Sequence, residues 1–270
     1  MSGTVPLVRY RSLEAFPGLA HGISTRQGGV SQGPYASLNL GWTVGDEAAH
    51  VEANYRRLAG ALGVCREDLT TTWQVHGSRI LRAGESDRGR MIDKADGIIT
   101  DVPDVPLIQR YADCTPLLVY DPRHHAAGLA HAGWRGTVAG VATSLVRAMR
   151  EAFGSDPADL LAVVGPAIGP CCYEVGPEVV GAVRRSLPPA WPLLSVPRSN
   201  GETVGDLDSA VHGRLHFDLW EANRRQLAVA GVGRVEVAQV CTRCQRDVYF
   251  SHRGDGGLTG RFAAVVMLRH

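Results

Sequence analysis

The chain has 270 residues, a formal net charge of +1, and 44% hydrophobic and 20% charged residues. This balance is ordinary for a soluble globular enzyme, and it argues against the basic surface that binds nucleic acid or acidic lipid. No apolar run approaches the roughly 18 residues of a membrane span. Because residues 1–16 also lack the apolar stretch of a secretory signal, a cytoplasmic location is expected.

Four segments repeat apolar residues at the spacing of an amphipathic helix. In chain order they are 46–62, 137–153, 177–187 and 218–230. Thr137 can cap the second helix, and Gly176-Pro177 opens the third, which ends before Pro188-Pro189.

Short apolar runs of strand length lie between these helices. They include Ile98–Thr100, Val105–Gln109, Pro116–Tyr120, Ala126–Ala130, Leu160–Val164, Val235–Val240 and Ala263–Leu268. The middle runs are apolar throughout, which indicates strands covered on both faces. We predict an α/β fold, a layered sandwich with a mixed sheet, in one domain spanning residues 1–270. The Pro-, Ser- and Gly-rich segment Trp191–Gly213 is expected to be a loop.

Three phrases carry the residues with the most distinctive chemistry. They are Gln74-Val75-His76-Gly77, Ala112-Asp113-Cys114-Thr115-Pro116 and Ala130-His131-Ala132-Gly133-Trp134-Arg135-Gly136. Each supplies one metal ligand near the expected end of a strand. Two imidazoles and one thiolate form a three-ligand zinc set with a vacant fourth position, which is the pattern of a catalytic zinc. Such a site keeps enough Lewis acidity to polarise a water or a phosphate oxygen.

The residues alone leave other interpretations open. The spacing of His76, Cys114 and His131 fits no local zinc signature, and a lone His or Cys is more often a packing residue. Cys114 and His131 could also be the nucleophile and base of a cysteine hydrolase or deamidase. Two histidines beside one thiol favour a metal, because a dyad needs only one. The concentration of ligand-type residues in three phrases disfavours a non-enzymatic partner module.

An anion site is expected beside this set. After His131 come a glycine-bearing turn and the helix expected to begin at Thr137, which would present free backbone N–H groups to an anion. Arg135 could hold phosphate oxygens with two parallel hydrogen bonds. The alternative is that Arg135 pairs with a carboxylate and pins the loop.

Three further side chains are candidates for substrate binding. Arg26 is a second anion candidate, and the amide of Asn39 could bind a ribose hydroxyl or a base edge. Gln74 would share a face with His76 if that stretch is extended. Each of the three could equally be structural.

Two other metal assignments are rejected. Cys241-Thr242-Arg243-Cys244 contains one C-x-x-C pair, but Cys171-Cys172 has the wrong spacing for the second pair of a zinc ribbon, so we predict no second metal site. A multicopper oxidase needs several His-rich clusters, and one three-ligand set cannot hold four coppers.

The three phrases resemble those of the YfiH-like, laccase-domain proteins, a family once labelled polyphenol oxidases and now regarded as zinc-dependent purine nucleoside phosphorylases. The resemblance runs nearly from end to end through His21–Arg26, Gly28–Ser31, Ser37–Gly41, Gly165–Ile168, Tyr173–Gly176, Cys241-Thr242 and Phe250–Arg253. At the last phrase, His252 and, just beyond the phrase, Gly254 replace the family's usual aromatic residue and second arginine. Arg253 is retained and is a further candidate for substrate or phosphate binding.

This resemblance implies a Zn²⁺ ion on His76, Cys114 and His131, and a fold similar to that of a cysteine-histidine toxin deamidase. It implies phosphorolysis of adenosine, inosine, guanosine or methylthioadenosine to free base and ribose 1-phosphate, with adenosine deaminase activity. Phosphate held by Arg135 would attack the ribose C1′, and Asp113 is our candidate for the general base or leaving-group acid. The partners would be nucleoside and phosphate only, with no nucleic acid or membrane, in a monomer or homodimer.

Overall fold

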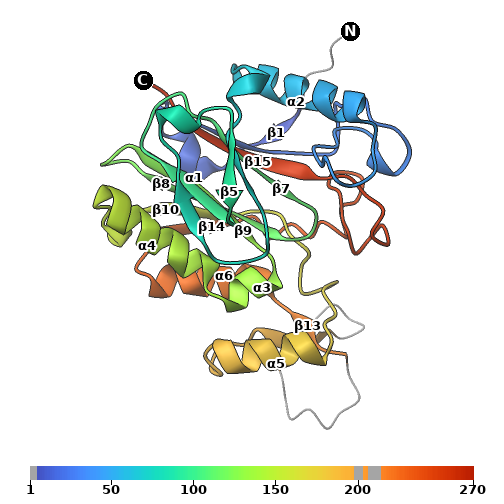
Figure 1. Cartoon of the computed structure of the whole chain (residues 1–270). Coiled ribbons are helices and arrows are strands. Elements are labelled where there is room, and N and C mark those ends of the chain that lie inside the picture. Colours follow the sequence, from blue (N-terminus) through green and yellow to red (C-terminus); the bar gives the residue numbers. More distant parts are fainter. Residues whose placement is uncertain (1–4, 198–202, 206–213) are drawn as a thin grey trace.

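Two stacked β-sheets form the centre of the protein (Figure 1). The computed structural model describes residues 5–197, 203–205 and 214–270. The first sheet contains, in spatial order, β1 (Leu7–Val8), β2 (Leu19–Ser24), β15 (Phe262–Leu268) and β7 (Leu107–Tyr111). The second contains β14 (Arg234–Val237), β10 (Leu161–Val164), β8 (Thr115–Asp121), β9 (Ala126–Ala132), β6 (Gly97–Thr100) and β4 (Ile80–Arg82). Most neighbouring strands are antiparallel, but β10 pairs with β14 and β4 with β6 in parallel, so the predicted mixed α/β fold is confirmed.

Alternating side chains of the central strands fill three layers of core. In β15, Phe262, Ala264 and Val266 pack between the two sheets, whereas Ala263 and Val265 pack toward helix α2. This alternation is the period-two pattern of a strand. Every residue of β8 and β9 is buried, as predicted from their apolar runs, because both of their faces are covered.

Helices cover the outer faces of both sheets (Figure 1). Helix α2 (Ala48–Leu62) lies on the first sheet, and α4 (Val141–Phe153) and α6 (Leu219–Val229) lie on the second. Helix α5 (Pro177–Ser186) lies in a smaller lobe at one end. The predicted helices at 46–62, 177–187 and 218–230 are confirmed to within two residues. Short helices complete the set: α1 (Arg11–Glu14), α3 (Trp134–Val138) and the 3₁₀ turns Gly33–Tyr35, Arg66–Asp68, Glu85–Asp87 and Pro157–Asp159.

One helix prediction is wrong at its start. The segment 137–153 forms two helices, because Gly140 takes a left-handed conformation (φ 77°) between α3 and α4. Thr137 therefore lies inside α3, where its buried hydroxyl accepts a hydrogen bond from Asn223. No helix begins at Thr137, so its N–H groups cannot form the expected anion site there.

The expected loop at Trp191–Gly213 is also partly wrong. Strands β11 (Leu194–Pro197) and β12 (Thr203–Gly205) lie within it and form a small sheet with β13 (His216–Phe217). The rest of that segment, 198–202 and 206–213, lies outside the described residues. The single-domain organisation stays a prediction.

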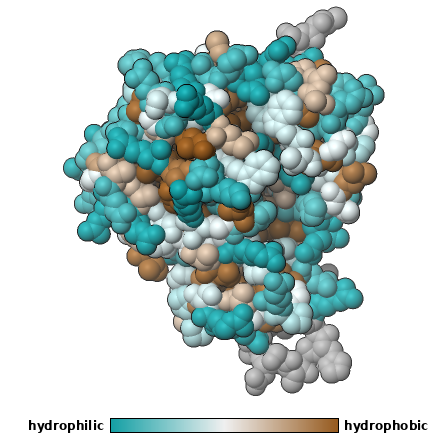
Figure 2. Space-filling view, in the orientation of Figure 1, coloured by the Kyte–Doolittle hydropathy of each residue, from teal (hydrophilic) through white to brown (hydrophobic). Residues whose placement is uncertain are grey.

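The surface is mostly hydrophilic, with apolar residues scattered between polar ones on the face in Figure 2. The exposed large hydrophobic residues include Trp42, Trp73 and Met91, which contribute to the cavity described below. A fourth, two-stranded sheet of β3 (Thr71–Trp73) and β5 (Met91–Lys94) holds two of them. Among the described residues, no helix is long and apolar enough to cross a membrane.

Candidate metal and substrate site

The structure brings His76, Cys114 and His131 together. Their ligand atoms all lie within 4.8 Å of one another, and the two imidazole centroids are 4.9 Å apart. His131 is buried, Cys114 is half-buried and His76 is exposed. The cluster is therefore held by the core on one side and open to solvent on the other.

The two stacked sheets fix the positions of the ligands. Cys114 lies where the chain crosses from β7 in the first sheet to β8 in the second, after a sharp turn at Asp113 (φ 82°). His131 lies on β9 directly opposite Pro116. His76 comes from the loop between β3 and β4. Its left-handed backbone (φ 63°) departs from the extended conformation that our expectation for Gln74 required.

Asp96 organises this cluster and was missed in the sequence. Its fully buried carboxylate accepts hydrogen bonds from His131 Nδ1 (2.9 Å) and from the backbone N–H groups of Val75, His76 and Gly77 (2.6–3.1 Å). The bond at Nδ1 leaves Nε2 of His131 free as a ligand, which is the usual role of a carboxylate behind a metal-binding histidine. A lone aspartate immediately before an apolar strand was the only signal for it.

Cys114 and His131 shift each other's pKa in the directions that favour a thiolate beside an imidazolium. Burial would raise the pKa of Cys114, but the imidazoles of His131 and His76 lower it to about 6. Burial would likewise lower the pKa of His131, but Cys114 and Asp96 raise it to about 9. Hydrogen bonds from His131 and the Gly77 and Val75 N–H groups outweigh burial and lower the pKa of Asp96.

The donor set fits zinc. Zinc accepts imidazole nitrogen and thiolate sulfur, and three protein ligands leave the fourth position for water or substrate. Gly133 allows the cluster to close, since a Cβ at that position would lie 2.9 Å from Cys114 Sγ and 3.2 Å from the His76 ring. Two imidazoles and one thiolate are also the set of a mononuclear copper site, so the ligands alone allow either metal.

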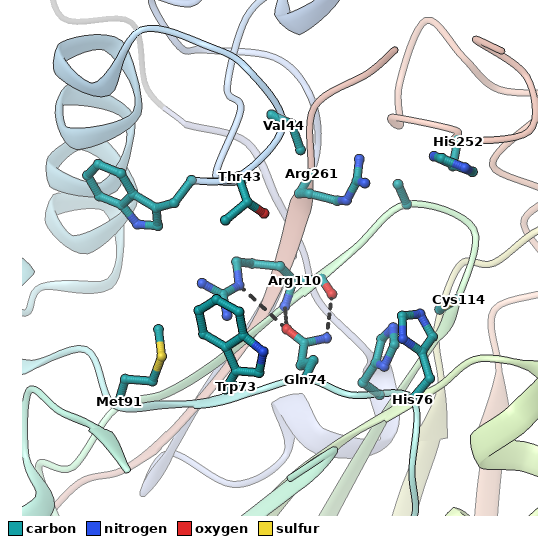
Figure 3. A pocket seen from close by; sticks show the side chains of 14 residues that line it. Thr43, Val44, Trp73, Gln74, His76, Met91, Arg110, Cys114, His252 and Arg261 are labelled. Carbon is teal, nitrogen blue, oxygen red and sulfur yellow. Dashed lines mark hydrogen bonds between the residues drawn. The ribbon is translucent and has the colours of Figure 1, made fainter. Parts of the chain in front are cut away.

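A cavity of about 470 Å³ opens beside the cluster (Figure 3). This volume lies in the range of small-molecule sites. Its lining comprises Gly41, Trp42, Thr43, Val44, Trp73, Gln74, His76, Met91, Arg110, Ala112, Cys114, His131, His252 and Arg261. The cavity thus combines aromatic surface, cationic groups and all three candidate metal ligands.

Arg110 and Arg261 are the cationic groups of this cavity, and the sequence interpretation overlooked both. Among the described residues, neither has a carboxylate within ion-pair distance; Arg261 donates to the carbonyls of Thr259 and Gly260. Burial lowers the pKa of Arg261, which lies in the field of Cys114. The signal was present: Arg110 is a charged residue inside an apolar strand, four positions before Cys114.

Gln74 lines the cavity, although its amide is engaged within the protein. Its Nε2 donates to the Arg110 carbonyl (2.8 Å), and its Oε1 accepts from the Arg110 N–H (3.1 Å) (Figure 3). Gln74 therefore fixes the β3–β4 loop to strand β7.

Arg135 and Arg253 are not among the residues that line the described cavity. Arg135 is exposed, contacts Glu178 at 3.2 Å and stacks on Trp134, the carboxylate pairing that we set against a phosphate role. Arg253 donates to the Glu174 carbonyl and lies over the ring of Tyr173. Both arginines influence Tyr173, whose pKa is raised by burial and by nearby Cys114.

The remaining predicted residues have partners inside the protein. The fully buried Asn39 accepts from the N–H groups of Gly41 and Arg261. Arg26 donates to the Ala36 and Arg246 carbonyls and lies over the Phe250 ring.

Asp113 accepts a hydrogen bond on each carboxylate oxygen. The Thr242 hydroxyl and the Arg253 N–H are the donors, both at 2.6 Å. As the residues stand, this carboxylate fixes the loop around Cys114.

Known proteins resemble this chain along almost its whole length. A family model described as "Multi-copper polyphenol oxidoreductase laccase" matches residues 20–269. Purine nucleoside phosphorylase YlmD of Geobacillus stearothermophilus is 40% identical over 93% of this chain and 90% of that protein. Purine nucleoside phosphorylase YfiH of Escherichia coli is 34% identical over 93% and 94%. The crystal structure of YlmD from Geobacillus stearothermophilus superposes with a TM-score of 0.88 at 38% identity, covering 100% of this chain and 98% of the other.

The fold and the site are those of a layered α/β protein with a His–Cys–His cluster beside a cavity. The chain belongs to the YfiH-like laccase-domain family, as its sequence predicted. The similarity to the toxin deamidase fold stays a prediction.

Proposed function

We propose that this protein is a zinc-dependent purine nucleoside phosphorylase that converts a purine nucleoside and phosphate to free base and ribose 1-phosphate. The observation that carries the proposal is the three-ligand cluster opening on a cavity with two arginines. The names of the relatives support it. Adenosine, inosine, guanosine and methylthioadenosine are the proposed substrates, and adenosine deamination the proposed side activity. A cytoplasmic monomer or homodimer completes the proposal.

His76, Cys114 and His131 would hold the zinc, which when bound supplies Lewis acidity beside the substrate. Asp96 keeps His131 in the tautomer that presents Nε2. Arg110 and Arg261 are the groups we assign to phosphate, because they line the cavity and have no carboxylate partner among the described residues. We prefer them to Arg135, which already pairs with Glu178.

The aromatic wall of the cavity suits a purine. Trp73 is 49% exposed and Trp42 is 39% exposed; Trp42 stacks on Tyr55 behind it with ring centroids 5.6 Å apart. A flat base gains stacking energy against such a surface, whichever purine it is. Phosphate close to C1′ would stabilise the positive charge that develops on the sugar as the base leaves. Asp113 stays our candidate for proton transfer, although it would first have to lose a bond to Thr242 or Arg253.

The direct test incubates the purified protein with inosine or adenosine, with and without phosphate. Phosphate-dependent release of hypoxanthine from inosine is expected. Ammonia from adenosine without phosphate would reveal the deaminase activity. No base release from any of the four nucleosides, by protein with its metal intact, would contradict the proposal. A Cys65→Ser variant, changed at an exposed cysteine outside the cluster, serves as the control.

A second candidate function has one specific observation behind it. Asp96, His131 and Cys114 form the carboxylate–imidazole–thiol sequence of a cysteine hydrolase or deamidase. This alternative predicts activity without metal, whereas the phosphorylase requires it. Chelation followed by metal addition separates the two: activity lost and then restored by zinc supports the phosphorylase, and activity unchanged supports the thiol enzyme.

A further inference from the structure

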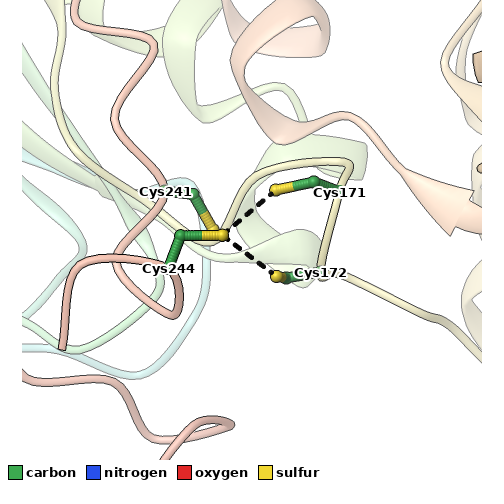
Figure 4. A group of neighbouring side chains, drawn as sticks. All are labelled: Cys171, Cys172, Cys241 and Cys244. Carbon is green, nitrogen blue, oxygen red and sulfur yellow. Dashed lines mark hydrogen bonds between the residues drawn. The ribbon is translucent and has the colours of Figure 1, made fainter. Parts of the chain in front are cut away.

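Four cysteines from two distant loops converge on one point (Figure 4). Cys171 and Cys172 lie in the turn between β10 and α5, and Cys241 and Cys244 follow β14. All four sulfur atoms lie within 4.8 Å of one another, with Cys244 Sγ 3.7 Å from Cys171 Sγ and 3.5 Å from Cys172 Sγ. We expected that Cys171-Cys172 could not complete a second site, because the two cysteines are adjacent in the sequence. The turn beginning at Gly169 nevertheless places both sulfur atoms next to Cys241 and Cys244.

The spacing of the sulfur atoms matches one tetrahedral ion. A zinc–sulfur bond of about 2.3 Å places the sulfurs of a tetrahedral site about 3.8 Å apart. The distances from Cys244 Sγ to Cys171 Sγ and Cys172 Sγ, 3.7 and 3.5 Å, lie close to that value. A cluster of several irons would spread its thiolates farther, because the ligands would bind different metal atoms.

The surroundings of the four sulfurs favour a bound cation. The N–H of Gly169 donates to Cys241 Sγ at 3.3 Å, and the Cys244 N–H also donates to it, so this sulfur is stabilised as a thiolate. N–H groups directed at a sulfur support its thiolate form, which is the form that ligates a metal.

We propose that Cys171, Cys172, Cys241 and Cys244 bind one structural zinc ion. Four protein ligands fill the coordination shell, so this site holds structure and leaves no position for a substrate.

The ion would join the two loops that support the Cys114 turn. Ala167 pairs with Cys241 in a β-bridge, and the Ile168 N–H donates to the Asp113 carbonyl (3.0 Å). The Thr242 hydroxyl donates to the Asp113 carboxylate. The proposed site is therefore linked through Ile168 and Thr242 to Asp113, the residue that precedes Cys114. It shares no ligand with the first cluster.

The test is metal analysis of protein expressed with zinc and iron both supplied and purified under reducing conditions. The wild type is expected to contain two zinc equivalents and Cys114→Ala one, with four sulfurs at about 2.3 Å by X-ray absorption. Cys244→Ser is expected to retain only the other equivalent, and Cys65→Ser to retain both. None of these readouts depends on phosphorylase activity. The proposed function can therefore be wrong while the zinc site is correct, and the zinc site can be wrong while the proposed function is correct.

The Cys114→Ala variant keeps the test decisive even if Cys244→Ser does not fold, because all four proposed ligands remain. No zinc in Cys114→Ala would overturn the proposal. Iron bound by the four sulfurs, or a disulfide among these cysteines found by alkylation and mass spectrometry, would do so as well.

Discussion

The two candidate metal clusters differ in scaffold, ligands and access. His76, Cys114 and His131 combine nitrogen and sulfur, and two of them come from the junction of two buried sheets. The second cluster, Cys171–Cys172 with Cys241 and Cys244, offers sulfur alone and comes from two loops. A metal on the first cluster would keep one coordination position facing the cavity, whereas a metal on the second would have four protein ligands. The number of protein ligands and the space beside them, more than the type of ligand, therefore distinguish a catalytic metal site from a structural one.

The support behind the ligands differs in the same way. A buried carboxylate, Asp96, orients His131, whereas backbone N–H groups of Gly169 and Cys244 stabilise Cys241. A carboxylate fixes the tautomer and the orientation of the histidine that it contacts, and both affect the reactivity of a metal site. N–H groups only stabilise charge on sulfur, which suffices for a closed site.

Removing a ligand of the cluster of His76, Cys114 and His131, the open cluster, should abolish most of the activity. Cys114→Ala should lower the rate of phosphorolysis at least about 1000-fold, because the metal and its Lewis acidity are lost together. Base release and metal content, measured on the same preparation, check this. Cys244→Ser is the matched cysteine variant, and its activity should fall far less. Equal losses of activity in the two variants would contradict the assignment of a catalytic role to the open cluster and a structural role to the four-cysteine cluster.

The second prediction uses the pH dependence of thiol alkylation after both metals are removed. The pKa of Cys114 is about 6 and that of Cys172 about 11, so at pH 7 the first is mostly thiolate and the second almost entirely thiol. Allowing for the lower nucleophilicity of the more acidic thiolate, Cys114 should react on the order of 100-fold faster. Because its pKa is lowered, its rate should be constant from pH 7 to 9 and fall as pH drops through 6.

Peptide mass spectrometry after a timed pulse of iodoacetamide measures both rates in one sample. A Cys114 rate that rises only above pH 8 would show that no imidazolium stabilises its thiolate. A Cys172 rate equal to that of Cys114 at pH 7 would contradict the raised pKa in the second cluster.

Asp96→Asn tests the orienting carboxylate. The substitution keeps the shape but weakens the bond to His131 Nδ1, and such changes typically reduce metal affinity or activity about 10- to 100-fold. The zinc affinity of the open cluster should fall, while the four-cysteine cluster keeps its equivalent. Zinc competition with a chromophoric chelator measures both. Loss of zinc from both clusters would mean that Asp96 supports the fold in general.

The sequence predicted most of the regular structure because apolar periodicity dominates burial. The fully apolar runs at β8, β9 and β15 and three of four helices followed from it. Strand β2 did not, because His21 and Gly22 interrupt its apolar run. His21 is buried as a neutral acceptor for the Tyr10 N–H, and burial lowers its pKa to about 4. The break at Gly140 was missed because helix periodicity continues across it.

The site was predictable only in part, since its ligands came from recognisable phrases but its neighbours did not. Arg110 and Arg261 are 151 positions apart in the numbering and meet only because β7 pairs with β15. The four cysteines meet across about 70 residues by the same kind of long-range contact. The spacing of residues in the sequence does not reveal such contacts, because they depend on the topology of the two sheets.

A smaller effect, on phosphate binding, tests whether the substrates bind in the cavity beside the open cluster. Arg110→Gln or Arg261→Gln should raise the phosphate KM about tenfold, the value of roughly one charged hydrogen bond. Arg243, an exposed arginine that contacts the Cys172 carbonyl at 3.4 Å, is the control beside the closed cluster, and Arg243→Gln should leave that KM unchanged. Arg135→Gln tests whether phosphate binds in the cavity or in the region of Tyr173 instead. If it raises the phosphate KM while the Arg110 and Arg261 variants do not, phosphate binds in the region of Tyr173, and the cavity arginines serve the fold.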